Sequence, residues 1–377
     1  MIYKFVSLDI SCNGKEENMK VMTILGTRPE IIRLSLIIKR LDKACSHTLV
    51  HTGQNHDYRL NELFFKELGI RKPDCFMGAK AATFGEQVAI IFRETERLIH
   101  KHRPDRILIL GDTNSGLSAI VAERMGVPVY HMEAGNRCFD LKVPEERNRK
   151  VIDSIASYAL PYTPGSRENL IVDGIPRHRI MVSGNPMFEV LQAYQSEIDS
   201  SDILESLGLK EREYVLVTAH RAENVDAESR LKEILGGLKG VARKLNLPVI
   251  CSVHPRTSAK LKQHGLKAGD SRIRFMEPFG FFDFVKLEKK AKLVLTDSGT
   301  VQEECCLFRV PAVTMRDTTE RPETVACGSN MVSKVNAVNI VRCAMHMCSA
   351  DTAWSFPDGY TVPDVSERVV KFILGEN

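Results

Sequence analysis

Short apolar runs recur along the chain, and glycine or polar residues follow most of them before a helix-like or loop segment begins. The clearest runs lie at 20–26, 105–110, 127–132, 214–218 and 293–295. Alternating strand and helix patterns are typical of parallel sheets that are covered by helices. The order of these segments therefore predicts an α/β fold built from strand–helix–strand units.

A break in this alternation divides the chain into two domains. The sequence Gly-Asn-Pro at 184–186 ends the first series of strands, and the polar stretch at 195–205 has no strand pattern. A chain of 377 residues is also longer than one typical hydrophobic core supports. We predict a first domain at 1–186 with an appended arm at 1–18, a second domain at 187–363, and a C-terminal segment at 364–377 that packs back on the first domain.

Composition limits the kinds of partner that the protein is expected to bind. The net charge of +4 is too small to indicate nucleic acid, and small anionic substrates fit it equally well. No apolar run is long enough to cross a membrane, and the first residues lack the apolar core of a signal peptide. The ten cysteines lack CxxC spacing, which is typical of reduced thiols and argues against a metal site. We therefore expect a cytoplasmic protein without a metal.

The stretch at 296–323, TDSGTVQEECCLFRVPAVTMRDTTERPE, follows an apolar strand and begins like a helix. Asp297 and Ser298 are expected to cap that helix, and Gly299 lets a ligand approach the backbone closely. The polar sequence Gln-Glu-Glu at 302–304 is expected in its first turn. The orphan N–H groups of such a turn form an anion site.

A second predicted strand, at 310–315, leads into the loop at 316–323, where cations, carboxylates and hydroxyls alternate. Either piece alone would suit a capped helix or a solvated loop. Two such pieces at adjacent strand ends favour a binding site, because the carboxyl ends of parallel strands meet at one edge of a sheet.

Carboxylates also follow two strands of the first domain. Asp112 and Glu133 stand at the carboxyl ends of strands that are close in sequence, at the edge where open α/β sheets bind ligands. Asp112 could instead cap a helix, and Glu133 could pair with Arg137. Because the acidic cluster at 144–146 lies nearby in sequence, a functional role is the better interpretation.

Absent motifs exclude several enzyme classes. No GxGxxG follows a strand, and GxxxxGK[ST], HExxH and GxSxG are missing, which disfavours nicotinamide enzymes, P-loop hydrolases, zinc proteases and serine hydrolases. Arg28, Arg33 and Arg321 could neutralise a diphosphate, although the first two would suit a surface equally well. Carboxylates could bind sugar hydroxyls, and a carboxylate or His220 could move a proton. A nucleoside diphosphate joined to a hydroxyl-rich group needs this set of side chains.

Short motifs run in one order from about Met19 to the C-terminal helix: GTRPEII at 26–32, GDTN at 111–114, EAGNR at 133–137, PEERNR at 144–149, SGN at 183–185, TAHRAEN at 218–224, TDSGTVQEE at 296–304 and MRDTTERPE at 315–323. This series resembles the non-hydrolysing UDP-N-acetylglucosamine 2-epimerases, and its last two motifs together are highly specific. The wordings GNRCFD, VPEERNRK and TAHRAENVD are most similar to a subgroup that makes UDP-N-acetyl-L-fucosamine from UDP-2-acetamido-2,6-dideoxy-L-talose.

The resemblance implies two Rossmann-like domains that face each other across a cleft, as in B-type glycosyltransferases, with the C-terminal helix returning to the first domain. It implies inversion at C2 by anti elimination of UDP to a 2-acetamidoglycal, followed by re-addition of UDP. No cofactor takes part. The expected protein is a homodimer that acts on a UDP-sugar for surface polysaccharide synthesis, without nucleic acid or membrane partners.

The family's functional residues can be carried over motif by motif. Asp112, Glu133 and Glu145 match the acidic residues of proton transfer and sugar orientation, and His220 matches a histidine near the diphosphate. The predicted UDP contacts are Arg28, Arg33, Phe284, Ser298, Gly299, Thr300, Glu304 and Arg321. The uracil would stack on Phe284, and Glu304 would bind the ribose hydroxyls. The sequence leaves open which carboxylate removes the proton, because environment sets each pKa.

Some positions depart from the family pattern. Ala222 stands where many relatives have a second arginine, Phe279 replaces a polar residue near the uracil, and Thr300 replaces the second glycine of DSGG. These changes fit an altered sugar specificity better than a loss of catalysis. The sequence Gln-Asn-His-Asp at 54–57 also differs from the motif with which some bacterial relatives bind an activating UDP-sugar, so we do not expect that regulation here.

Other functions are alternatives. The sugar could be UDP-N-acetylglucosamine, converted to UDP-N-acetylmannosamine. A UDP-sugar-dependent glycosyltransferase of the same fold would need an acceptor groove, and it would leave the carboxylates of the first domain without a role. A hydrolysing epimerase would release free UDP. A sugar-nucleotide sensor would bind without turnover, although the presence of Asp112, Glu133, Glu145 and His220 argues against it.

Overall fold

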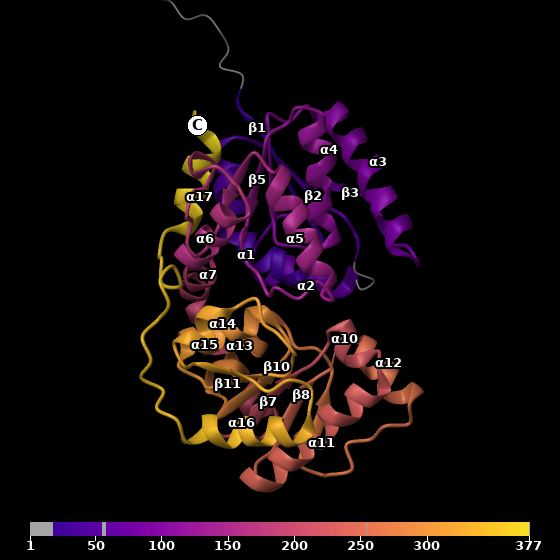
Figure 1. Cartoon of the computed structure of the whole chain (residues 1–377), viewed down its shortest axis with the longest axis vertical. Coiled ribbons are helices and arrows are strands. Elements are labelled where there is room, and N and C mark those ends of the chain that lie inside the picture. Colours follow the sequence, from indigo (N-terminus) through magenta and orange to yellow (C-terminus); the bar gives the residue numbers. More distant parts are fainter. Residues whose placement is uncertain (1–17, 55–57, 254, 377) are drawn as a thin grey trace, which may run out of the picture.

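The computed structural model describes residues 18–54, 58–253 and 255–376, which form two lobes with one parallel sheet each (Figure 1). Of the predicted arm at 1–18, only residue 18 is among them, and of the motif at 54–57, only residue 54. Within the described ranges, no helix combines the length and the apolar character that crossing a membrane requires.

The first sheet has the strand order β3-β2-β1-β4-β5-β6, and all of its pairings are parallel. The order reverses between β1 and β4, and ligands bind such sheets beyond the carboxyl ends of the strands at this point. Its strands are β1 (Lys20–Leu25), β2 (Ser46–His51), β3 (Cys75–Phe76), β4 (Arg106–Leu110), β5 (Val129–Met132) and β6 (Tyr158–Leu160).

Helices cover both faces of the first sheet because its strands are apolar on both faces. Leu108 of β4 is buried on one side, and Ile107 and Ile109 are buried on the other, since successive strand residues face opposite ways. The helices of this lobe are α1 (Arg28–Ala44), α2 (Tyr58–Glu67), α3 (Phe84–His102), η1 (Asn114–Leu117), α4 (Ser118–Arg124), α5 (Pro144–Ile155), α6 (Pro164–Val172) and η2 (Arg177–Arg179).

The second sheet repeats this design with the order β12-β11-β10-β7-β8-β9, again parallel throughout. Its strands are β7 (Val215–Thr218), β8 (Val249–Ser252), β9 (Ile273–Met276), β10 (Leu293–Thr296), β11 (Ala312–Thr314) and β12 (Asn330–Val332). Its helices are α10 (Ala222–Val225), α11 (Glu228–Leu245), α12 (Pro255–Gln263), α13 (Phe281–Lys290), α14 (Gly299–Phe308), α15 (Pro322–Ala326) and α16 (Ala337–Ser349).

Two connections join the lobes. Three short helices, α7 (Met187–Ala193), α8 (Gln195–Ser200) and α9 (Ile203–Ser206), lead from the first sheet to the second. The last helix, α17 (Val365–Leu374), returns to the first lobe, where Val369 is buried in the same core as Leu41 of α1 (Figure 1). The predicted fold class is therefore confirmed: two Rossmann-like domains face each other across a cleft. The boundary between 186 and 187 stays a prediction.

The predicted strands differ from the observed ones at the ends of the sheets. The apolar residues at 180–182 predict a further strand, but the described chain makes only an isolated bridge there, between Ala159 and Ile180. The backbone N–H groups of Met181 and Ser183 still donate to the carbonyl oxygens of Ala159 and Pro161, and Gly184 follows with a φ of 87°. The sequence analysis did not predict β3 and β12, because two or three residues are too few to form a periodic pattern.

Candidate active site

The carboxyl ends of both sheets face the cleft, and a group of buried charged side chains joins the two lobes there. We call Arg33, Glu133, Glu303 and Arg321 the ion ring. Arg33 of α1 binds Glu133 with 2.8 Å between Nη1 and Oε2, and it binds Glu303 with 2.5 Å between Nη2 and Oε2. Arg321 closes the ring by binding Oε1 of both glutamates. Two positive and two negative charges therefore alternate, and each pair that crosses the cleft links the two domains.

The ring controls the ionisation of Glu133. Burial alone would raise the pKa of this carboxyl, but Arg33 and Arg321 outweigh burial and hold the pKa below its usual range. In Glu303, burial dominates and raises the pKa. Both arginines have raised pKa values, since the neighbouring carboxylates more than offset their desolvation. Glu133 is thus an ionised carboxylate inside a buried site.

The structural alternatives for Asp112 and Glu133 are wrong. Thr113, and not Asp112, caps η1 by accepting from the backbone N–H of Ser115. Arg137 pairs with Asp153, at 2.7 Å between Nη2 and Oδ2, instead of with Glu133. Asp112 is bound by a different cation, Arg149.

Arg149 holds the second carboxylate of the first domain. It binds Oδ2 of Asp112 with 3.0 Å from Nε and 2.5 Å from Nη2, and its Nη1 binds Glu146. Glu146 also accepts from the backbone N–H of Cys138 at 3.0 Å and from that of Phe139 at 3.2 Å. Glu146 therefore shapes the loop before α5, and Asp112 is held with one fixed orientation.

Glu145 has the opposite environment. Its Oε2 is inaccessible and has no hydrogen-bond partner in the part of the chain that the structure describes. Its Oε1 lies 3.8 Å from Nη1 of Arg221 in the second domain. Burial raises the pKa of this carboxyl, and Arg221 only partly opposes that effect. An acid whose pKa is raised therefore lies near Asp112, a carboxylate that an arginine binds.

In the second domain, Asp297 does not cap α14 as the sequence suggested. Its Oδ2 accepts from the backbone N–H groups of His220 and Arg221, at 3.0 Å each, and from the side-chain amide of Asn224. The reason is that β7 lies next to β10, which brings the segment after β7 beside Asp297. Ser298 occupies the N-cap position, and no side-chain cap bond occurs there among the described residues. The glutamates of the motif lie beyond the first turn, at the fifth and sixth helical positions.

His220 is the titratable group at the edge of this arrangement. Its side chain is 44% exposed, and its Nδ1 lies 3.4 Å from Oδ1 of Asp297. Desolvation within the cleft lowers the pKa of the imidazole, Asp297 opposes this, and the cations Arg221 and Arg28 add to the lowering. A histidine held neutral can accept a proton or donate one hydrogen bond.

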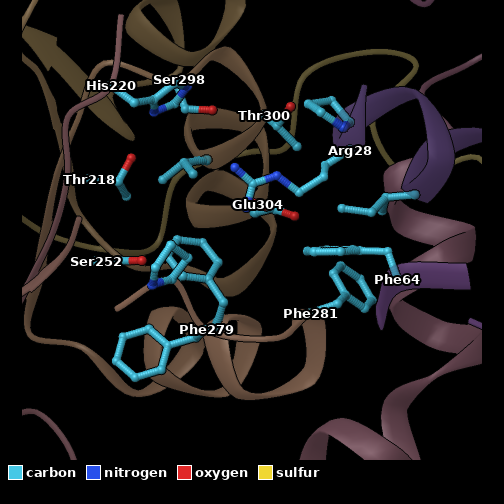
Figure 2. A pocket seen from close by; sticks show the side chains of 15 residues that line it. Arg28, Phe64, Thr218, His220, Ser252, Phe279, Phe281, Ser298, Thr300 and Glu304 are labelled. Atoms are coloured by element: carbon cyan, nitrogen blue, oxygen red, sulfur yellow. The ribbon is translucent and has the colours of Figure 1, made fainter. Parts of the chain in front are cut away.

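A pocket of about 850 Å³ opens beside the ion ring, and its walls come from both domains (Figure 2). Phe279, Phe281 and Phe284 line one part, whereas Arg28, His220 and the start of α14 line another. Its remaining lining residues are Pro29, Ile32, Phe64, Thr218, Ser252, Pro278, Ser298, Thr300, Val301 and Glu304. An aromatic part next to a cation and a helix N-terminus suits a planar base joined to phosphates.

The structure thus divides the predicted site residues into connected groups. The pocket collects Arg28, His220, Phe284, Ser298, Thr300 and Glu304, and the ring holds Arg33, Glu133 and Arg321. Gly299 begins α14, where a Cβ would lie 2.8 Å from Oε1 of Glu320. Glu145 is linked to Glu320 through Arg221, and Asp112 is bound by Arg149. Glu303 belongs to the polar helix start that the sequence indicates, but its place in the ring is not evident from the sequence.

Comparisons with known proteins agree with this arrangement. Residues 39–374 match the family described as UDP-N-acetylglucosamine 2-epimerase. The UDP-N-acetylglucosamine 2-epimerase of Methanocaldococcus jannaschii is 37% identical over 94% of this chain and 99% of its own. The UDP-2,3-diacetamido-2,3-dideoxy-D-glucuronate 2-epimerase of Pseudomonas aeruginosa is 36% identical over 83% of this chain and 88% of its own. These two similar proteins are named for different sugars.

A solved structure also resembles the whole fold. The crystal structure of the M. jannaschii UDP-GlcNAc 2-epimerase in complex with UDP-GlcNAc and UDP superposes with a TM-score of 0.89 at 36% identity. The match covers 94% of this chain and 99% of that one. Both sheets and the cleft between them therefore have counterparts in a protein that was crystallised with a nucleotide sugar.

Proposed function

Because the chain belongs to the UDP-N-acetylglucosamine 2-epimerase family, we propose that it is an isomerase that inverts C2 of a UDP-2-acetamido sugar without net release of UDP. One observation carries this proposal. Arg33 reaches both the pocket and a carboxylate, since its Nη2 lies 3.1 Å from Oγ1 of Thr300 and its Nη1 lies 2.8 Å from Oε2 of Glu133. A nucleotide in the pocket would therefore place its sugar beside buried acids.

The pocket suggests how UDP would lie. The uracil would stack on Phe284, and Glu304 would accept from the ribose hydroxyls. The diphosphate would meet Arg28, His220 and the N–H groups at the start of α14, where the helix dipole favours an anion. This placement leaves C1 and C2 of the sugar facing the first domain.

The chemistry explains why the enzyme must hold UDP so firmly. The C2 hydrogen has no adjacent carbonyl that would acidify it. When UDP departs from C1, positive charge develops next to C2, and a carboxylate can then remove the proton to give a glycal. UDP must return to the same carbon while a proton is delivered to the opposite face of C2. A buried, closed cleft keeps water from capturing the cationic intermediate.

The environments of the carboxyl groups suggest their roles. Asp112 and Glu133 are each bound by arginines, so they are the candidates for accepting the C2 proton. Glu145 keeps its proton to a higher pH and is the candidate for delivering one. The pKa of Glu133 is lowered and that of Glu145 is raised, and acid–base catalysis uses acids whose pKa values are pushed apart in this way. His220 would assist the departure and return of UDP.

For the sugar, we propose UDP-2-acetamido-2,6-dideoxy-L-talose, with UDP-N-acetyl-L-fucosamine as product. The motifs GNRCFD, VPEERNRK and TAHRAENVD favour it, as does the loss of an arginine at Ala222. UDP-N-acetylglucosamine is the second candidate, because the M. jannaschii protein with 37% identity is named for that sugar. In either case the product would serve surface polysaccharide synthesis, and we propose that the enzyme works as a homodimer.

Proton NMR in heavy water tests both the proposed reaction and the proposed sugar. The protein is incubated separately with the 6-deoxy-L-talose and the N-acetylglucosamine form of the UDP-sugar. We expect inversion and deuterium uptake at C2, faster with the first compound. A glycosyltransferase would cause neither change, and a hydrolysing epimerase would accumulate free UDP in proportion to turnover. No C2 exchange with either sugar would contradict the proposed reaction, and faster exchange with the second would contradict the proposed substrate.

A further inference from the structure

Two carboxyl groups meet beneath the pocket, and one of them has no role in the mechanism above. Glu288 of α13 is completely buried, and its neighbour Leu287 lies in an apolar core with Val301 of α14. The side chain of Glu288 hydrogen-bonds that of Glu304, which lines the pocket. A buried acid therefore supports the residue that faces the ribose.

This contact requires a proton. Two ionised carboxylates cannot hydrogen-bond each other, and burying both charges in an apolar layer is prohibitively costly. Among the described residues, no cation acts on Glu288. Arg33 acts on Glu304, but Glu133 and Glu303 already bind this arginine. One of the two carboxyl groups must therefore be protonated for the pair to exist.

The neighbouring thiol indicates where the proton lies. Cys305 donates from Sγ to Oε1 of Glu288 over 3.2 Å, which makes that oxygen an acceptor. Oε2 of Glu288 is inaccessible and receives no donor in the described part of the chain. A proton on Oε2 that points to Glu304 satisfies both oxygens of Glu288 at once. The result is a chain of donors from Cys305 through Glu288 to Glu304.

We propose that Glu288 is a positioning residue of the nucleotide pocket. Its protonated carboxyl donates a hydrogen bond to Glu304 and thereby holds Glu304 as the acceptor of the ribose hydroxyls. This inference rests on the proposed function, because it needs a nucleotide in the pocket. Glu304 alone could turn, or could take up the proton itself and present a hydroxyl instead of two acceptors. With Glu288 as donor, one oxygen of Glu304 is occupied and the other is free to bind ribose.

Other charged groups act on this pair from the surrounding elements. Glu303 and Arg33 act on Glu304 from α14 and α1. Cys305 adjoins Glu288 from α14, Cys306 acts on that thiol in turn, and Tyr214 lies near Glu288 before β7. Asp199 of α8 also packs near α13, but it pairs with Lys289 at 3.0 Å. None of these groups replaces the donor that Glu304 receives from Glu288.

Calorimetric titration with UDP tests the role of the donor. Glu288→Gln keeps an N–H donor toward Glu304, whereas Glu288→Met has a similar size and offers none. We expect Glu288→Gln to bind UDP within about twofold of wild type, and Glu288→Met to bind about tenfold or more weakly, as loss of a hydrogen bond to a charged group implies. The exposed Glu277→Gln serves as the control and should bind like wild type. Equal affinities of the Met and Gln variants would overturn the proposal.

Infrared spectroscopy of the ligand-free protein detects the proton on the Glu288–Glu304 pair directly. At pH 7.5, the wild-type protein should show the C=O band of a buried protonated carboxyl that Glu288→Gln lacks. Absence of this difference would overturn the proposal even if every variant binds UDP. Conversely, failure of the wild-type protein to bind UDP would contradict the proposed function, while the infrared band would still establish the protonated pair.

The pH dependence distinguishes positioning from a merely structural role. Burial raises the pKa of Glu304 to about 8, with Glu288 as its partner. The pKa of Glu288 is raised well above its ordinary value, so Glu304 ionises as the pH rises through about 8 while Glu288 keeps its proton, and the UDP affinity of the wild type should rise between pH 7 and 9. Glu288→Met removes the donor that lowers the pKa of Glu304, so its rise in affinity should move to higher pH. Identical profiles of these two proteins would show that the pair does not position the nucleotide.

Discussion

Arg33 of α1 binds Glu303 of α14 across the cleft, with 2.5 Å between Nη2 and Oε2, although the two residues are 270 positions apart in the sequence. The same arginine binds Glu133 on its own side of the cleft. Glu303 therefore shares with Glu133 the neutralisation of the positive charge of Arg33. The contact between the two lobes and the ionised state of Glu133 both depend on this ring.

Replacing Glu303 should destabilise the protein strongly. Glu303→Gln keeps the shape of the side chain but leaves two buried arginines facing one carboxylate. Removal of one partner of a buried ion pair typically costs about 3–5 kcal/mol. Urea unfolding should show a loss of this size. The control is Glu367→Gln, whose solvent-exposed pair with Lys371 is expected to contribute little to the free energy of unfolding. Equal losses in the two variants would contradict the importance of the ring.

Glu133→Gln and Asp112→Asn should separate catalysis from binding. Both changes keep side-chain size but remove a carboxylate that we propose as the acceptor of the C2 proton. We expect turnover to fall by about 10²–10⁴-fold, the usual contribution of a general base, while UDP still binds. Deuterium exchange at C2 and calorimetry measure the two quantities. Near-wild-type exchange in both variants would exclude these residues as catalytic acids and bases.

Gly135 holds the loop that follows Glu133 in place. Its φ is 77°, and a Cβ there would lie 2.1 Å from the backbone oxygen of Ser166. Gly135→Ala should therefore cost more than about 4 kcal/mol or prevent folding. Gly174 is the matched control, since its φ is 92° but nothing lies within 4 Å of its Cβ position. Gly174→Ala should cost only about 1–2 kcal/mol in a thermal unfolding assay. Similar losses would contradict the crowding at Gly135.

Much of the fold could be predicted from the sequence because its signals are local. Apolar residues at helical spacing from 84 to 102, with Pro104 after them, predict a helix, and α3 has these bounds, Phe84–His102. Asp112 and Glu133 could be placed at one sheet edge because parallel strands all end there. The residue types and the order of the motifs also indicated the kind of reaction that these side chains could serve.

The remaining features depend on how distant segments meet. Nothing near Glu303 in the sequence indicates that it faces Arg33, because that contact requires the two domains to close on each other. Asp297 has the sequence position of a helix cap, yet the adjacent strand β7 supplies the N–H groups of His220 and Arg221 that it binds instead. Likewise, the donor from Glu288 to Glu304 depends on the packing of α13 against α14.

The raised pKa of Glu145 predicts the alkaline side of the pH–rate profile. Burial moves the pKa of this carboxyl above its ordinary value of 4.5, so its acid form persists to higher pH. If Glu145 delivers the proton to C2, kcat should fall as pH rises through that pKa, because the proton donor is then lost. Glu145→Gln cannot titrate, and we expect it to be slower by about 10²–10⁴-fold and to lack this alkaline decline. Initial rates of C2 inversion across the pH range measure both effects. A variant that keeps the wild-type decline would show that another group, such as His220, controls it.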